Sequence, residues 1–302
     1  MARRGHRIVF VTGKGGVGKS LVAAATANQL ARSGREVLLV EFGSRSFYGA
    51  LLDLPIDAAS SGEPVSWRKG IQIARWDAES SLREYLTHYL LFKAATDRIL
   101  GNTAMKALVA VAPSLPELAL LGRLTAPMRH RWYRREVDAV VVDGYSTGQF
   151  MALLRAPRGL AAAGGSGPIH AQSKAILDLL RDPAVCDYRL VTLAEEMPVA
   201  EACEMAADLR DETGIAPTVL CNRLVELPAR IPTVPPGTPA AAFLQNMAEL
   251  QRRQKRSLAR LAALGADRAG PVCRLPLVPD PDPLEVIERL TDALGDAPGA
   301  AT

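Results

Sequence analysis

The stretch GKGGVGKS, residues 13–20, decides the fold of this 302-residue chain. It fits the pattern G-x-x-x-x-G-K-[ST], in which a glycine-rich loop follows a strand and opens a helix. The glycines let backbone amides converge on phosphate oxygens, the lysine adds positive charge, and the last hydroxyl group binds Mg²⁺. An apolar run precedes the loop at residues 7–12, and a helical pattern follows at about 19–33. The required strand–loop–helix context is therefore present.

This loop predicts a site for a nucleoside triphosphate and Mg²⁺. We expect Lys19 to place its charge on the β- and γ-phosphates and Ser20 to bind the metal. The helix after Gly18 directs the positive end of its dipole at the same anion. The predicted nucleotide-binding residues of this stretch are Gly13, Lys14, Gly15, Gly16, Val17, Gly18, Lys19, Ser20 and Leu21.

Short apolar runs alternate with helical patterns along the rest of the chain. Runs of five to seven residues without polar alternation are typical of parallel strands that helices cover on both faces. We therefore predict an α/β fold, a doubly wound and mostly parallel sheet with right-handed crossovers, in a single domain of residues 1–302. The predicted strands are residues 7–12, 36–42, 137–143, 188–193 and 218–222, and the helices about 19–33, 149–162, 171–181, 198–213 and 240–264.

Two stretches interrupt the alternation. Residues from about 79 to 135 have leucines and tyrosines at helical spacing and predict a helical insertion. Residues 227–239 contain five prolines, which lack the amide donor that a helix or sheet needs, and predict a connecting loop.

Composition and charge exclude several classes of protein. Hydrophobic residues at 48% and charged residues at 23% are ordinary globular values, which excludes a disordered or fibrous chain. The sequence has no apolar run long enough to span a bilayer and no secretory signal, so we expect a cytoplasmic protein. A net charge of +4 is a weak field, and we expect no nucleic-acid partner. The basic clusters at 129–135 and 252–256 are interpreted as solvated helix surface rather than as phosphate contacts.

Four segments together resemble one family. The extra Lys14 in GKGGVGKS resembles the deviant P-loop of the ArsA and tail-anchored-protein-targeting ATPases and their Min-system relatives. DGYSTGQ at 143–149 resembles the second switch of that family, whose usual form is DTAPTGH. LAEEMP at 193–198 is similar to its segment after a late strand, and CNR at 221–223 to its adenine-recognising strand end. The resemblance runs from about residue 7 to 295, with the helical insertion only weakly matched.

The resemblance implies an ATP- and Mg²⁺-dependent dimer whose nucleotide state controls binding of a protein client. Lys14 would reach across the dimer interface to the phosphates of the partner, Asp143 would bind Mg²⁺ through water, and Asn222 would hydrogen-bond the adenine edge. The residues themselves leave other roles open, because Asp143 could cap the next helix and Asn222 could sit in a turn. Relatives also use the helical insertion as a client groove, although packing against the sheet is the better interpretation of its leucines.

The first switch departs from the family pattern. An Asp-Pro pair is usual just after the second strand, but aligning the strand places Gly43 and Ser44 there. Loss of a carboxylate that orients the attacking water should slow phosphoryl transfer by orders of magnitude. Glu41 lies two residues upstream, on the same side of the strand, and could replace it. A Glu paired with an arginine at the sheet end is an equally good interpretation. Gln149 in place of the usual His is a milder change.

We therefore predict a nucleotide-controlled dimer with slow or partner-dependent ATP hydrolysis, in which Lys14, Lys19, Glu41 and Asp143 are the candidate catalytic residues. The partner would be an identical chain or a paralogous ATPase. A non-hydrolysing regulatory subunit paired with an active paralogue is the main alternative, and a Min-like partitioning ATPase the weaker one. A GxSxG motif at 144–148 would fit an esterase, but no acidic residue lies between it and His170. The four cysteines form no CxxC pair, which argues against a bridging zinc and against arsenite export.

Overall fold

Apolar strands form the sheet of this α/β protein. The computed structural model describes residues 7–56, 62–89, 114–129, 137–163, 168–228, 234–265 and 270–295. Five strands fall on the five predicted apolar runs: β1 (Arg7–Gly13), β2 (Val37–Phe42), β5 (Ala139–Asp143), β6 (Cys186–Leu193) and β7 (Thr218–Leu224). Every residue of β5 is buried, as expected for a strand that is covered on both faces.

The sheet has eight strands in the order β3-β4-β2-β5-β1-β6-β7-β8. β2 pairs in parallel with β4 and β5, and β7 pairs in parallel with β6 and β8. Only the edge strand β3 (Val65–Arg68) is antiparallel to its neighbour, β4 (Ile71–Trp76), among the strand pairs whose register is given. The predicted fold class, a mostly parallel α/β sheet, is confirmed.

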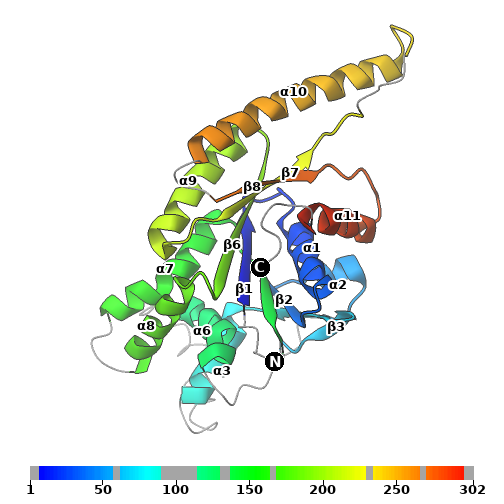
Figure 1. Cartoon of the computed structure of the whole chain (residues 1–302). Coiled ribbons are helices and arrows are strands. Elements are labelled where there is room, and N and C mark those ends of the chain that lie inside the picture. Colours follow the sequence, from blue (N-terminus) through cyan, green and yellow to red (C-terminus); the bar gives the residue numbers. More distant parts are fainter. Residues whose placement is uncertain are drawn as a thin grey trace. The chain divides into compact units, whose positions relative to one another are not determined.

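The chain divides into two compact units, whose helices and strands are labelled in Figure 1 where there is room. The first comprises residues up to Phe10 together with Leu30–Asp187, and the second comprises Val11–Gln29 together with Tyr188–Thr302. The helices of the first unit are α2 (Phe47–Leu52), α3 (Ala78–Tyr89), α6 (Leu115–Arg129), α7 (Thr147–Ala163) and α8 (Pro168–Leu180). Those of the second are most of α1 (Lys19–Arg32), and α9 (Glu196–Thr213), α10 (Pro239–Gly265) and α11 (Pro283–Gly295).

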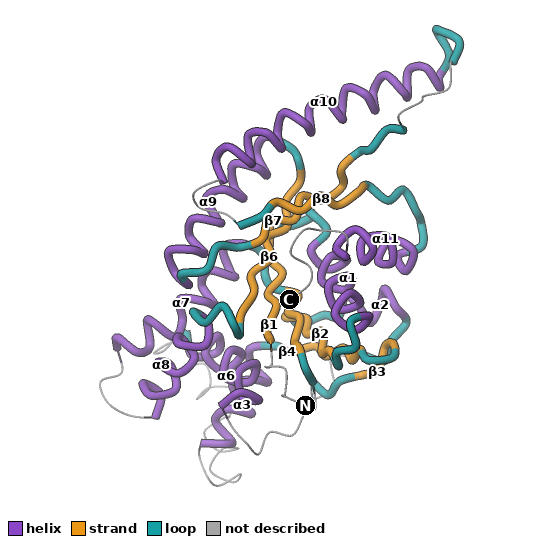
Figure 2. The backbone as a smooth tube through the Cα atoms, in the orientation of Figure 1, coloured by secondary structure: helices purple, strands orange, loops and turns teal. Residues whose placement is uncertain are grey.

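In the first unit, α3 and α6 lie in the stretch expected to be a helical insertion, and they pack against each other. Leu82 on α3 and Leu118 and Leu121 on α6 are at most 1% exposed, so these side chains belong to a core. Residues 90–113 and 130–136 lie outside the described part of the chain, and with them most of the first basic cluster. Figure 2 shows α7 and α8 side by side in the same unit.

In the second unit, α1 buries the residues from Val22 to Asn28 and packs against α11. The Asn28 side-chain amide donates to the Thr291 hydroxyl at 3.2 Å and to the Glu288 carboxylate. The long helix α10 packs on α9 and β7, with Leu261 in a cluster with Val199 and Val219. The start of α1, where the glycine-rich loop ends, is therefore part of a packed helix.

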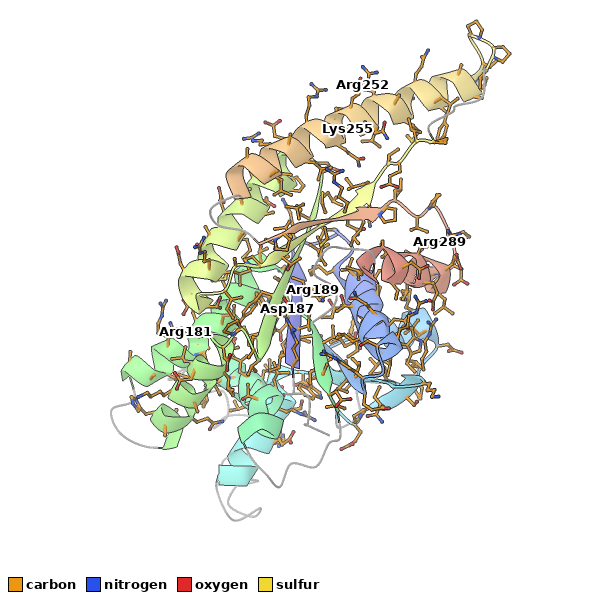
Figure 3. The ribbon with its side chains drawn as sticks, viewed as in Figure 1. Arg181, Asp187, Arg189, Arg252, Lys255 and Arg289 are labelled. Atoms are coloured by element: carbon orange, nitrogen blue, oxygen red, sulfur yellow. The ribbon has the colours of Figure 1, made fainter. Side chains whose placement is uncertain are left out.

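The second basic cluster lies on α10, where Figure 3 labels Arg252 and Lys255. Glu249 on the same helix forms ion pairs with Arg252, Arg253 and Arg256 at 3.1 to 3.9 Å. These exposed pairs agree with the interpretation of a solvated helix face. Within the described residues, no helix is both long enough and apolar enough to cross a membrane.

Candidate nucleotide-binding site

The glycine-rich loop joins β1, which ends at Gly13, to α1, which begins at Lys19. A Cβ atom on Gly13 would lie 2.2 Å from the Val191 carbonyl oxygen, so no larger residue fits where the loop leaves the strand. Gly16 and Gly18 have φ values of +85° and +92°, which side chains rarely allow. A Cβ atom on Gly15 or Gly16 would meet nothing within 4 Å, so this part of the loop is open.

The side chains at the end of the loop provide the groups that a triphosphate needs. The Lys19 ammonium group donates to the Lys14 carbonyl oxygen at 3.1 Å, so the side chain folds back over the loop. Ser20 and Leu21 follow in the first turn of α1, and this turn has no acidic residue to offset the positive end of the helix dipole. Open backbone, an ammonium group and a hydroxyl group fit a nucleoside triphosphate with Mg²⁺.

Asn222 supports the loop from β7. Its side chain is 5% exposed, and its amide nitrogen donates to the Val17 carbonyl oxygen at 2.9 Å. A Cβ atom on Gly18 would lie 2.6 Å from the same nitrogen, so the loop and Asn222 are in close contact. The Asn222 side-chain oxygen accepts from the Arg223 backbone amide at 2.9 Å. Contact with adenine remains a prediction, whereas contact with the loop is observed.

A glutamine that the sequence did not single out fixes the end of β7. Gln254 on α10 is 7% exposed. Its amide nitrogen donates to the Arg223 carbonyl oxygen at 2.9 Å, and its oxygen accepts from the Val225 amide at 2.8 Å. Its only sequence signal is a polar residue on the apolar face of a helix, which is too common to indicate a site.

Lys14, the extra lysine of the loop, forms an ion pair within its own chain. Its ammonium nitrogen lies 2.5 Å from Oε1 of Glu201 on α9, and both side chains are partly exposed. Sequence reasoning missed Glu201, because nothing in its local context distinguishes it from other acidic residues of α9.

Two buried carboxylates lie side by side in the first unit. Glu41 on β2 stands opposite Asp143 on the parallel strand β5, and they are 4% and 8% exposed. The Tyr48 hydroxyl donates to Oδ2 of Asp143 at 3.2 Å. Glu41 accepts from the Ser46 hydroxyl and from the backbone amides of Phe47, at 2.7 Å, and Tyr48, at 3.5 Å. The Glu41 carboxylate thus caps the start of α2.

Burial controls the ionisation of this cluster. Burial raises the pKa of Glu41, and the hydrogen bonds from residues 46–48 and the charge of Arg75 oppose that rise. For Tyr48, burial first and then the charges of Asp143 and Glu41 raise the pKa well above its ordinary value. The Tyr48 hydroxyl therefore keeps its proton at neutral pH and acts as a donor.

The backbone of the first switch is held on β4. Gly43 donates its amide to the Trp76 carbonyl oxygen at 3.1 Å, and its carbonyl oxygen accepts from Arg75 at 2.9 Å. Its φ of +151° is a conformation that favours glycine. In the second switch, the Tyr145 ring contacts Phe42, with centroids 5.5 Å apart, and Gln149 is exposed at the start of α7.

The described residues include no group of three or more His, Cys, Asp or Glu side chains placed to hold a metal ion. All four cysteines are free thiols, and burial raises the pKa of Cys221 to about 12.

Comparison with known proteins shows what the chain is similar to. The sequence profile of the anion-transporting ATPases (ArsA ATPase) matches residues 6–163. The ATPase BagA of Mycobacterium tuberculosis (strain H37Rv) is 32% identical over 231 residues, which are 75% of this chain and 67% of that protein. A putative arsenical pump-driving ATPase of Halobacterium salinarum is 30% identical over 71% of this chain, but only 35% of its own length is covered. An arsenical pump-driving ATPase of Escherichia coli is 29% identical over 72% of this chain, and 34% of its own length is covered.

If Asn222 supports the loop, Asn222→Ala should weaken the binding of inorganic tripolyphosphate as well as that of ATP, both measured with Mg²⁺. Removal leaves the buried Val17 carbonyl oxygen without this donor, which costs about 1–3 kcal/mol. Isothermal titration calorimetry with both ligands measures this. A residue that acts only on adenine would lower the affinity for ATP and leave that for tripolyphosphate unchanged, and that result would contradict the supporting role.

Proposed function

The chain belongs to the anion-transporting ATPase (ArsA) family, and on that premise we propose that it is a nucleotide-controlled dimer. In this proposal ATP and Mg²⁺ bind at the glycine-rich loop, hydrolysis is slow or depends on a partner, and nucleotide state controls the binding of a protein client. The observation that carries the proposal is the loop itself. Gly15 and Gly16 leave its backbone open, and Lys19 is folded back over it.

In this proposal, different residues of the chain bind different parts of the nucleotide complex. The loop amides and Lys19 would hold the phosphates, Ser20 would bind the metal directly, and Asp143 would bind it through water. Mg²⁺ would supply positive charge where negative charge develops on the transferring phosphoryl group. Adenine recognition by Asn222 is part of the proposal, alongside its observed contact with the loop.

Dimer closure requires Lys14 to change partner. Lys14 is paired with Glu201 of its own chain, and a lysine that serves the partner's phosphates must leave that carboxylate. An exposed pair contributes only about 0–1 kcal/mol, and a triphosphate carries several negative charges. The phosphates of a second nucleotide can therefore outcompete Glu201.

The first switch supports slow or conditional hydrolysis. Gly43 supplies no carboxylate at the usual position, and Glu41 already accepts three hydrogen bonds from residues 46–48. A role for Glu41 in orienting water would require the start of α2 to release it. The same observation favours the second candidate function, a subunit that binds nucleotide without cleaving it and pairs with an active paralogue.

The two loop lysines should behave differently. Lys19→Ala should abolish ATP binding, because it removes the charge on the β- and γ-phosphates. Lys14→Ala should spare binding and remove residual turnover, because its proposed target is the nucleotide of the partner subunit. Calorimetry and a phosphate-release assay measure the two effects. Equal losses in both variants would rule out the role across the interface.

Glu201→Gln should increase ATP-dependent dimerisation. The change removes the charge that holds Lys14, and the dimer dissociation constant with ATP and Mg²⁺ should fall by up to about fivefold, with a smaller effect at high salt. Sedimentation velocity measures it. Glu204→Gln is the matched control, an exposed carboxylate on the same helix. Identical dimerisation of the two variants would show that the Lys14–Glu201 pair does not oppose closure.

Restoring the usual acid should not restore activity. Gly43→Asp should destabilise the fold by about 1–3 kcal/mol, because φ at this position is +151°, and should leave ATP turnover unchanged. Thermal unfolding and ATP turnover are measured for Gly43→Asp and for the control variant Gly43→Ala, which carries the same backbone strain without the carboxylate. A clear gain of turnover in Gly43→Asp alone would refute this account of the first switch.

A further inference from the structure

We propose that Tyr48 is a positioning residue for Asp143, and that Glu41 holds Tyr48 in place through the start of α2. Tyr48 would thereby set the affinity of the nucleotide complex for Mg²⁺. This inference rests on the proposed function, because it concerns the carboxylate that would hold the metal through water. It assigns a role to two residues of the first switch region without requiring either to touch the nucleotide.

The first step is the contact between Tyr48 and Asp143. Tyr48 is fully buried, and its hydroxyl donates to Oδ2 of Asp143 at 3.2 Å. A short carboxylate side chain at the end of a strand can rotate, and a donor fixed on one oxygen restricts that rotation. Hydrogen-bonding partners of this kind orient metal-binding groups, and their loss commonly costs 10–100-fold in metal affinity.

The second step is the anchor of Tyr48. It is the second residue of α2, a helix of only six residues that needs support from outside. Glu41 accepts from the Ser46 hydroxyl and from the amides of Phe47 and Tyr48, and the Ser46 hydroxyl oxygen accepts from the Gly49 amide at 2.8 Å. The first turn of α2 is therefore tied to strand β2.

The third step is that the two sets of contacts are connected to each other through α2. Glu41 and Asp143 are opposite residues of β2 and β5, so α2 is connected to two neighbouring strands at the same level of the sheet. Residues 43–45 connect Glu41 and its strand to Ser46 at the start of α2. A movement of this segment that releases Glu41 would displace Tyr48, and Asp143 would lose the hydrogen bond from the Tyr48 hydroxyl. The first switch region, which lacks the usual Asp, would thus act on the metal through Tyr48.

Tyr48→Phe tests the proposal, because it removes one oxygen atom and keeps the buried ring. The main measurement is the Mg²⁺ concentration that gives half-maximal enhancement of ATP binding. The affinity for ATP in EDTA and the thermal unfolding temperature are measured on the same variants. We expect this Mg²⁺ concentration to rise about tenfold. ATP affinity without metal should stay unchanged. Tyr188→Phe, the same change at a buried tyrosine on β6, is the control and should leave the Mg²⁺ requirement unaltered.

Glu41→Gln completes a double-mutant cycle. Like Tyr48→Phe, it should raise the Mg²⁺ concentration needed for half-maximal enhancement of ATP binding. The double variant should need no more Mg²⁺ than Tyr48→Phe alone, since both changes act through one hydroxyl group. An unchanged Mg²⁺ requirement in Tyr48→Phe overturns the proposal, as does an equal loss of metal-dependent and metal-free ATP affinity, which would indicate a merely structural role. Absence of ATP binding in the unaltered protein would instead refute the proposed function, and the positioning role with it.

Discussion

The close approach of the glycine-rich loop to the ends of β6 and β7 is the constraint on which the rest of the second unit depends. Gly13 passes within van der Waals distance of the Val191 carbonyl oxygen, and Gly18 lies against the Asn222 amide. A side chain at either glycine would force the loop away from these strands. The loop is held there and α1 begins at Lys19, whose ammonium group donates to the Lys14 carbonyl oxygen of the loop. The loop amides and the helix dipole form an anion site, and Lys19 adds the positive charge that the β- and γ-phosphates require.

Two buried carboxylates in the first unit show how one small helix can serve two functional strands. Burying a carboxylate is costly unless hydrogen bonds or positive charge compensate for lost water. Glu41 obtains that compensation from residues 46–48 and Arg75, and Asp143 obtains part of it from Tyr48. These donors belong to α2, its capping residue or the neighbouring strand β4. Glu41, which lies two residues before the position of the usual Asp, thus already holds α2, and Tyr48 of α2 donates to Asp143, the proposed metal-binding residue.

Local sequence signals predicted the centre of the fold well and its periphery poorly. The apolar runs of β1, β2, β5, β6 and β7 are distinctive because both faces of a central parallel strand are buried. β3, β4 and β8 (Val272–Pro276) were not predicted, because polar residues interrupt them, as Gln72 and Arg75 do in β4. The helices α2 and α11 were missed as well. The six residues of α2 are too few for a helical period, and their helical form depends on the Glu41 cap, a contact made by a different element.

The sequence alone determined that residues 13–20 form a phosphate-binding loop between a strand and a helix, because the glycine, lysine and serine positions act within one local turn of chain. It also determined the family, through motifs that are each continuous in sequence. Only the tertiary structure decided which groups hold the functional side chains. Glu201 pairs with Lys14 from 187 positions away, Tyr48 with Asp143 from 95, and Asn222 with Val17 from 205. No local pattern encodes such partners, since the order of strands in the sheet, rather than the order of residues in the chain, brings them together.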